Sequence, residues 1–382
     1  MKIKYIIVGC GFSGSVIAER IANELKEKVL ILEKRAHIGG NCYDYKDSNG
    51  IIIHKYGPHL FHTDYKEVYE YLSKFTDWIE YEHRVMAYVD GQTIPLPFNF
   101  NSIDKVYSKA KADILKDKLI RMYGKGKRVG ILELMRSSDL DIKELSKYIY
   151  DKIFVNYTAK QWGKKPEEIN ITVTSRVPVV IDYDNRYFQD RYQYIPNKGY
   201  TEIFKRMLNN RLIDIKLKTD FKQALRLDFE SGEIYLYGEK FVGKVIFTGM
   251  IDELCGFRYG ILPYRSLKFK LKTINKDRFQ ETAVVNYPND YKYTRITEYK
   301  HIHKTRSEKT AIMYEYPCEY KKGGMPFYPI FTEEAQKMYQ RYRELINKFD
   351  NIILLGRLAE YRYYDMDDVI KRALETYERI KI

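Results

Sequence analysis

Residues 2–33 read KIKYIIVGCGFSGSVIAERIANELKEKVLILE, and this stretch decides the fold. An apolar run predicts a strand that leads directly into the turn Gly9-x-Gly11-x-x-Gly14. The apolar residues that follow recur at three- and four-residue spacing, which predicts a helix. A second predicted strand, residues 28–32, ends in Glu33. A strand, a glycine turn, a helix and an acid-terminated strand in this order are typical of a Rossmann unit that binds a dinucleotide.

Each of these residues has a physical role in dinucleotide binding. Gly9 allows the tight turn, Gly11 lets the backbone approach a pyrophosphate, and Gly14 lets the helix pack close to the strand. The helix N-terminus supplies amide donors for the anion. Glu33 can accept hydrogen bonds from ribose hydroxyls, which favours a ribose without a 2′-phosphate.

The next segment, residues 33–41 (EKRAHIGGN), favours FAD over NAD. It resembles the paired-glycine extension of FAD-binding proteins such as the glutathione reductase and amine oxidase families. In those families the two glycines, here Gly39 and Gly40, bring a loop against the diphosphate and the ribityl chain. The chain has no CxxC motif, and no second GxGxxG follows a predicted strand, so a pyridine-nucleotide disulfide reductase is disfavoured.

The C-terminal end supports the same prediction. Residues 351–357 (NIILLGR) read as a strand that ends at Gly356, ahead of an acid-rich start to a terminal helix at 369–380. Residues 244–249 form another strand that ends in glycine. We therefore expect a discontinuous FAD domain assembled from both ends of the chain.

Composition narrows the class of protein. No apolar run among the 382 residues approaches the roughly 20 needed to cross a bilayer, and no signal peptide is evident, so we expect a cytoplasmic protein without membrane insertion. Four scattered cysteines and the spacing of the histidines predict neither a disulfide framework nor a metal site. The net charge of +14 indicates an anionic partner, and no nucleic-acid-binding motif appears.

Seven further segments, in order, resemble bacterial UDP-galactopyranose mutases. They are YGPHLFHT (56–63), NYTAKQWG (156–163), SRVP (175–178), DNRYF (184–188), YTRI (293–296), MPFYP (325–329) and GRLAEYRYYDM (356–366). They span almost the whole chain and are jointly specific.

The resemblance implies an isomerase that interconverts UDP-galactopyranose and UDP-galactofuranose with no net redox change. In this family, N5 of reduced FAD forms a covalent adduct with the sugar, so the cofactor carries the bond-making chemistry. The resemblance also implies a homodimer, an external reductant such as NAD(P)H or a reduced flavin donor, and a product used for cell-surface polysaccharide.

The resemblance assigns roles residue by residue. His59 matches a histidine beside the flavin, and Arg176 and Arg295 match the arginines that hold the diphosphate, with residues 170–180 bringing Arg176 over it. The expected substrate-binding residues are Tyr157, Thr158, Trp162, Arg176, Tyr187, Arg295, Tyr328, Tyr363 and Asp365. The expected cofactor-binding residues are Gly9, Gly11, Phe12, Ser13, Gly14, Glu33, Lys34, Gly39, Gly40, Asn41, His59, Leu60, Gly356, Arg357, Tyr363, Asp365 and Met366.

We therefore expect an α/β protein with a discontinuous Rossmann-type FAD-binding domain at 1–78, 197–255 and 335–382. A helical domain is predicted at 102–165 from the patterned stretches 103–123, 131–135 and 145–154. A largely antiparallel sheet domain is predicted at 79–101, 166–196 and 256–334, where 265–271 alternate and 291–299 are rich in β-formers.

Two other functions remain open at this point. A flavin oxidase or desaturase of the amine oxidase type would share the glycine motifs but not the arginine and aromatic set. A non-catalytic nucleotide-binding protein that retains FAD would share both.

Overall fold

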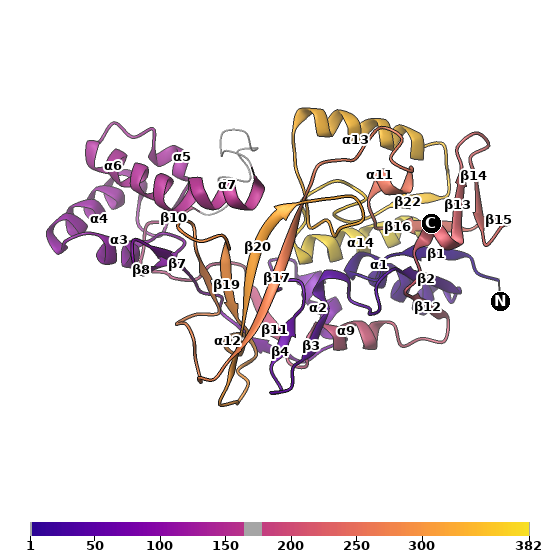
Figure 1. The fold of residues 1–382 in the computed structure, drawn as a ribbon, viewed down its shortest axis with the longest axis horizontal. Helices are drawn as coiled ribbons and strands as arrows, with labels where there is room; N and C mark the ends of the chain where they lie inside the picture. The colour runs from indigo at the N-terminus through magenta and orange to yellow at the C-terminus, as the bar shows by residue number, and fades with distance from the viewer. Residues whose placement is uncertain (1, 164–177, 382) are drawn as a thin grey trace.

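The computed structural model describes residues 2–163 and 178–381, and it shows three regions along one axis (Figure 1). A parallel sheet between helices lies at one end, a long mixed sheet lies in the middle, and a group of helices lies at the other end. The predicted α/β class, with added helical and sheet regions, is confirmed.

The parallel sheet has the strand order β12-β2-β1-β16-β22. Strand β1 (Tyr5–Val8) pairs with β2 (Val29–Glu33) on one side and with β16 (Lys244–Phe247) on the other. Strand β12 (Ile213–Leu217) extends the sheet beyond β2, and β22 (Ile352–Leu354) extends it beyond β16. Both ends of the chain thus contribute to one sheet, as the two glycine-terminated strands predict.

Helices cover both faces of this sheet. Because side chains alternate along a strand, Ile7 packs with the helices of one face, while Ile6 and Val8 pack on the other. The first face carries α1 (Phe12–Arg20) with its π-helical extension Ile21–Leu25, α9 (Tyr200–Met207) and α14 (Met366–Lys381). The second carries α11 (Ile251–Leu254), α13 (Glu333–Ile346), α10 (Phe221–Ala224) and a small sheet of β13 (Leu225–Asp228), β14 (Glu233–Leu236) and β15 (Glu239–Phe241).

The central sheet has the order β21-β17-β20-β19-β18-β7-β8. Its neighbouring strands are antiparallel except β18 and β7, which run parallel. The strands are β21 (Tyr328–Pro329), β17 (Tyr264–Ile274), β20 (Thr310–Glu319), β19 (Arg295–Glu298), β18 (Val284–Asn286), β7 (Val85–Val89) and β8 (Gln92–Leu96). The long pair β17 and β20 forms the bridge between the two ends of the molecule (Figure 1).

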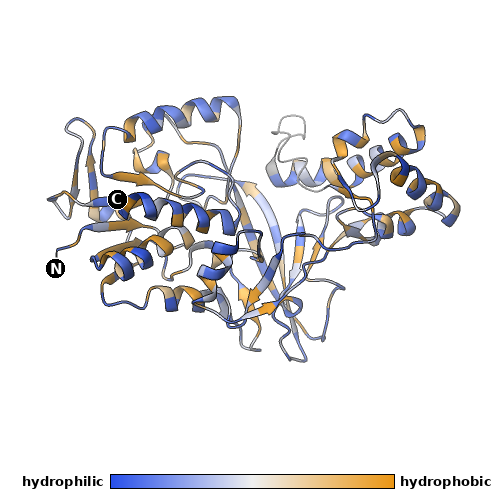
Figure 2. Ribbon diagram, turned by 180° about the vertical axis from the view of Figure 1, so that it is seen from behind, coloured by the Kyte–Doolittle hydropathy of each residue, from blue (hydrophilic) through white to orange (hydrophobic). Residues whose placement is uncertain are grey.

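The helical region packs its apolar faces onto β7 and β8 in one core. The helices are α3 (Phe100–Val106), α4 (Lys109–Tyr123), α5 (Ile131–Leu134), α6 (Leu140–Ile149), a π-helical turn at Tyr150–Val155, and α7 (Asn156–Trp162). Asn99 caps α3 and Asp139 caps α6 through side-chain hydrogen bonds, which satisfies backbone donors at both helix starts. Figure 2 shows the resulting stripes of apolar and polar residues along the helices.

Short elements complete the fold near the site. Strand β3 (Asp44–Lys46) pairs with β4 (Ile52–His54) just after the 3-10 turn Gly40–Cys42. Strand β11 (Tyr192–Pro196) lies between β5 (Phe61–Thr63) and β6 (Trp78–Glu80). The remaining elements are β9 (Arg128–Val129) with β10 (Val179–Val180), α2 (Lys66–Ser73) and α12 (Tyr299–His303).

Two sequence-based expectations differ from the structure. The helical stretch at 103–123 is two helices, because Tyr107 adopts an extended conformation after α3. The predicted β-run at 291–299 is wrong at both ends, since β19 begins at Arg295 and Tyr299 starts the helix α12. Tyr299 is fully buried and donates a hydrogen bond to the carbonyl of His54, so packing overrides its β propensity.

Candidate active site

One cavity of about 1060 Å3 lies between the parallel sheet, the central sheet and α7. Ordinary small-molecule sites occupy roughly 300–1,000 Å3, so this cavity is large enough for more than one compact ligand. Its walls come from both ends of the chain and from the helical region, and it extends from the glycine turn to α7.

The glycine turn forms the first wall. Gly9 has a φ of +99°, and a Cβ there would lie 2.2 Å from Oγ1 of Thr248, so only glycine fits this turn. Helix α1 begins after Gly11 with no side-chain cap and no acidic residue in its first turn. Its N-terminus therefore presents amide donors to an anion in the cavity.

A second backbone segment lies against this turn. A Cβ on Gly40 would come 2.8 Å from the Cα of Gly11, so the two glycines meet backbone to backbone. The N–H of Gly39 also donates to the carbonyl of Cys10 at 2.8 Å. This cradle fits a diphosphate that must touch both segments, as expected for a dinucleotide.

Glu33 terminates β2 and is 5% exposed. Oε2 of Glu33 accepts from the N–H of Cys10 and Oε1 accepts from the N–H of Arg35, both at 2.8 Å. A carboxylate oxygen accepts more than one hydrogen bond, so the same group can still meet ribose hydroxyls. The two backbone contacts hold it in that position.

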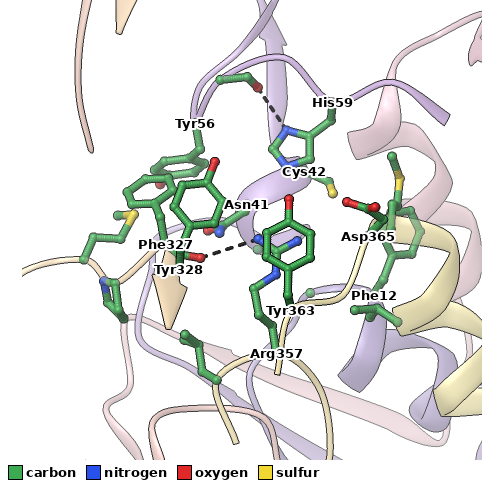
Figure 3. A pocket seen from close by; sticks show the side chains of 18 of the residues that line it. Phe12, Asn41, Cys42, Tyr56, His59, Phe327, Tyr328, Arg357, Tyr363 and Asp365 are labelled. Carbon is green, nitrogen blue, oxygen red and sulfur yellow. Dashed lines mark hydrogen bonds between the residues drawn. The ribbon is translucent and has the colours of Figure 1, made fainter. Parts of the chain in front are cut away.

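His59 lies in the middle of the cavity wall, on the loop after β4 (Figure 3). The ring Nδ1 of His59 lies 2.9 Å from the carbonyl of Gly57. The backbone N–H of His59 donates to Nδ1 of His54 at 3.0 Å. Burial, together with the nearby charges of Arg357 and Arg295, lowers the pKa of His59 to about 4. The imidazole is therefore neutral at neutral pH.

Arg357 lies opposite His59, beside two stacked tyrosines (Figure 3). The rings of Tyr328 and Tyr363 are parallel within 7°, with centroids 6.2 Å apart, and the guanidinium carbon lies 5.8 Å and 5.3 Å from their centroids. Arg357 also donates through Nε to the carbonyl of Tyr364 at 3.1 Å. The three side chains form one wall of the cavity, with Asp365 next to it.

Arg295 enters the cavity from β19 as half of an ion pair. Its Nε donates to Oε2 of Glu315 at 2.8 Å, and Glu315 is 2% exposed. Arg295 also lines the cavity, so this ion pair lies in the cavity wall. Burial raises the pKa of Tyr157 and Tyr328, which lie close enough to interact with this guanidinium, so both phenols stay protonated donors.

Helix α7 supplies Tyr157 and Thr158 to the wall at the far end. Two amide side chains that the sequence did not single out join them: Gln161, one turn further along α7, and Asn286 at the end of β18. Oε1 of Gln161 and Oδ1 of Asn286 are buried with no hydrogen-bond partner in the described part of the chain. Unsatisfied buried acceptors of this kind point to a ligand that donates to them.

At one side of the cavity, the ring of Phe188 lies between two histidines, His62 and His83. The ring of Phe188 stacks on His62, with centroids 3.6 Å apart, and faces His83 at 5.7 Å. Nδ1 of His62 lies 3.2 Å from Asp190, whose charge raises the pKa of His62 against the effect of burial. Burial lowers the pKa of His83 to about 3. No sequence signal marks His83.

The structure thus brings most of the predicted site residues to one cavity. Gly14 and Gly356 lie behind the wall, where a Cβ would meet the carbonyl of Gly9 and Oγ of Ser13 respectively. Trp162 belongs to α7, and Arg176 with residues 170–177 of its predicted loop lies outside the described residues. The predicted site residues that line the cavity are Gly9, Gly11, Phe12, Ser13, Glu33, Lys34, Gly39, Gly40, Asn41, His59, Leu60, Tyr157, Thr158, Tyr187, Arg295, Tyr328, Arg357, Tyr363, Asp365 and Met366.

The described part of the chain, residues 2–163 and 178–381, shows neither a metal centre nor a membrane-spanning helix. In those ranges no group of three or more His, Cys, Asp or Glu side chains is arranged to hold a metal ion. Within the same ranges no helix combines the length and the apolar character that a bilayer crossing demands.

Comparisons with known proteins agree with this geometry. The chain is 36% identical to a dTDP-fucopyranose mutase of Escherichia coli, with 97% of each chain covered. It is 35% identical to a probable UDP-galactopyranose mutase of Klebsiella pneumoniae over 97% of this chain and 93% of that one. A UDP-galactopyranose mutase of Mycoplasma pneumoniae is 32% identical over 99% and 96% of the two chains.

Solved structures share the fold. A reduced UDP-galactopyranose mutase covers the whole chain with a TM-score of 0.72 at 15% identity, and 94% of its own chain is covered. A putative protoporphyrinogen oxidase from Exiguobacterium covers the whole chain with a TM-score of 0.64 at 13% identity, and 99% of its own chain is covered. At these identities the likeness concerns the fold alone.

Two family profiles match the sequence. An NAD(P)-binding Rossmann-like domain matches residues 7–75, which contain the glycine turn and Glu33. The UDP-galactopyranose mutase family matches residues 152–363, which contain α7, Arg295, Tyr328 and Arg357. The chain belongs to the UDP-galactopyranose mutase family.

Proposed function

We propose that the protein is a flavin-dependent isomerase that interconverts UDP-galactopyranose and UDP-galactofuranose. The observation that carries the proposal is the continuity of the cavity. It runs from the dinucleotide cradle at Gly11, past His59, to the arginine and aromatic set at Arg295 and Tyr157. A dinucleotide held at the cradle would place its second half beside His59, and the remaining space would accept a second nucleotide.

The proposed cofactor is FAD in its reduced form. The Gly11–Gly40 cradle fits a diphosphate, and Glu33 fits the hydroxyls of an unphosphorylated ribose. Once bound and reduced, the flavin would supply a nucleophilic ring nitrogen that can bond to the anomeric carbon. The electrons come from an external donor such as NAD(P)H or a reduced flavin, because the sequence has no second GxGxxG after a strand.

Arg295 would stabilise the charge of the departing diphosphate. Glu315 occupies its Nε and fixes the plane of the guanidinium, so the other N–H groups keep one orientation. Preoriented charged donors need no rearrangement when negative charge develops, which is where such groups contribute most to rate. Arg176 is proposed as the second arginine on the basis of the family motif alone.

Helix α7 would anchor the nucleoside. The ring of Tyr157 offers a flat face for the base, and the unpartnered oxygens of Gln161 and Asn286 accept from base or ribose donors. An anchored nucleoside diphosphate stays close to the sugar after the bond between them breaks. Its return is then effectively intramolecular, which removes much of the entropic cost of re-forming the bond.

Turnover with defined nucleotide-sugars tests this proposal. The FAD-loaded protein, with and without dithionite, is incubated with UDP-galactofuranose, dTDP-fucofuranose or putrescine. The proposal predicts UDP-galactopyranose from the first compound only in the reduced sample. Preferential conversion of dTDP-fucofuranose would identify dTDP-fucose, in place of UDP-galactose, as the substrate. Amine-dependent oxygen uptake without isomerisation would contradict the proposal, and so would inertness with tight UDP binding.

A further inference from the structure

Two buried histidines lie directly behind His59. His54, at the end of β4, is fully buried, and His303, at the end of α12, is 9% exposed. Their Nε2 atoms are 2.9 Å apart, although 249 residues separate them in the chain. Nδ1 of His54 lies 3.0 Å from the backbone nitrogen of His59. A line of hydrogen bonds therefore runs from α12 through β4 to the loop that carries His59.

The donors and acceptors in this line follow from chemistry. A backbone N–H can only donate, so Nδ1 of His54 carries a lone pair, and in neutral His54 the proton is on Nε2. That proton points at Nε2 of His303, which must accept it. The proton of neutral His303 is then on Nδ1, and this atom is buried without a partner among the described residues.

The same reasoning assigns the tautomer of His59. A carbonyl can only accept, so the proton of neutral His59 is on Nδ1, facing the carbonyl of Gly57. Its Nε2 is left with a lone pair. His59 thus offers the cavity an acceptor, which suits an N–H of a reduced flavin or a hydroxyl and does not suit a carbonyl oxygen.

The surroundings keep the pair neutral. Burial lowers the pKa of His54 well below its ordinary value and that of His303 to about 4. Tyr299 donates to the carbonyl of His54, and the ring of Tyr200 packs edge-on at 5.6 Å. A protonated His54 would have donors on both nitrogens and would lose the contact with the N–H of His59.

We propose that His54, oriented by His303, is a positioning residue that holds the 57–59 loop so that His59 presents an acceptor to the flavin. The inference rests on the proposed function in one respect, namely that a flavin lies beside His59. An apolar side chain in place of His54 would fill the same space but would leave the N–H of His59 without its acceptor.

Variants of His54 separate the acceptor from the volume. In H54N the side-chain oxygen takes the place of Nδ1 and still accepts from the backbone N–H of His59. In H54F the ring volume is kept but this hydrogen bond is lost. H54F should lower kcat about 10- to 100-fold with KM within about twofold, and should shift the visible spectrum and the midpoint potential of the bound flavin. H54N should have a kcat, a visible spectrum and a midpoint potential close to those of the wild type.

His301 provides the matched control. His301 lies on α12, as His303 does, and its Nε2 contacts the carbonyl of Gln280 and the carboxylate of Glu298. H301Q should leave kcat, spectrum and potential unchanged. The proposal is overturned if folded, FAD-loaded H54F matches the wild type in spectrum, potential and kcat. It is equally overturned if H54N is as impaired as H54F.

A measurement on the unaltered protein covers the case in which H54F does not fold. Nitrogen-15 NMR of histidine-labelled holoprotein at neutral pH distinguishes protonated from unprotonated ring nitrogens. We expect the proton of His54 on Nε2, and those of His303 and His59 on Nδ1. A protonated Nδ1 in His54 would contradict the inference. This result and the flavin potential are independent of turnover, so they test the positioning role even if the proposed isomerisation fails.

Discussion

Nε of Arg295 donates to Oε2 of Glu315 at 2.8 Å, and the same carboxylate approaches within 3.4 Å of the space a Cβ on Gly57 would fill. One buried acid thus pairs with Arg295 and also lies close to the space beside Gly57, on the loop that leads to His59. Burial alone would lower the pKa of Arg295, but the charge of Glu315 raises it well above its ordinary value. The guanidinium of Arg295 therefore stays charged at neutral pH.

Removing Glu315 leaves a buried charge without its partner. E315A should lower the free energy of unfolding by about 3 kcal/mol, because uncompensated buried charges typically cost 3–5 kcal/mol and Arg295 retains some exposure. The double variant R295M/E315L should recover most of this loss while remaining inactive. Urea unfolding of the three proteins measures both effects, and equal stability of the single and double variants would contradict this view of the pair.

Tyr157 should contribute to nucleotide binding through its ring face. Y157A should weaken UDP binding by about 1–3 kcal/mol, the range found for base stacking on aromatic side chains, whereas Y157F should bind within about twofold of the wild type. Calorimetric titration of the oxidised holoprotein with UDP measures this. Y148F on α6, outside the cavity wall, is the control, and an unchanged Kd for Y157A would exclude the stacking role.

Alanine substitutions at two glycines of the dinucleotide turn should have different effects, one on stability and the other on FAD binding. A Cβ on Gly14 would lie 2.1 Å from the carbonyl of Gly9, so G14A should prevent normal packing of α1 and lower the melting temperature of the apoprotein. A Cβ on Gly11 would meet only the Cα of Gly40, at 3.7 Å. G11A should fold normally and lose FAD, because the methyl group occupies the diphosphate position. Tight FAD binding by G11A would refute the placement of the diphosphate.

Asp252 should make stability depend on pH. It is fully buried, accepts from the N–H of Leu262 at 2.9 Å, and burial raises its pKa to about 6. The folded state therefore binds a proton that the unfolded state has already released between about pH 4 and 6, so stability falls as the pH rises through this window. Between pH 4 and 7 the wild type should lose about 2 kcal/mol relative to D252N. Parallel stability profiles for the two proteins would contradict this.

The parts of the site that depend on local backbone geometry could be predicted from the sequence. The turn at Gly9, the helix start after Gly11 and the acid at Glu33 each act within one βαβ unit, so spacing alone fixes their arrangement. The two later strands that end near Gly249 and Gly356 were recognised in the same way, and both join the predicted sheet.

The parts of the site that depend on long-range packing could not be predicted from the sequence. Glu315, Asn286 and His83 reach the site from strands or loops whose neighbours are set by the topology of the central sheet. The pairing of His54 with His303 joins a short strand to α12, for which the sequence predicted no helix. Arg295 was expected from the family motif, but its carboxylate partner left no local signal because Glu315 is 20 residues away.

The geometry of a substrate complex tests the central claim most directly. A crystal structure of the reduced, FAD-loaded protein with UDP-galactose should place the uracil on Tyr157, the diphosphate at Arg295, and the anomeric carbon about 3–4 Å from N5 of the flavin, within reach of bond formation. A uridine bound away from Tyr157, or a sugar held beyond contact with the flavin ring in a demonstrably reduced crystal, would contradict the account.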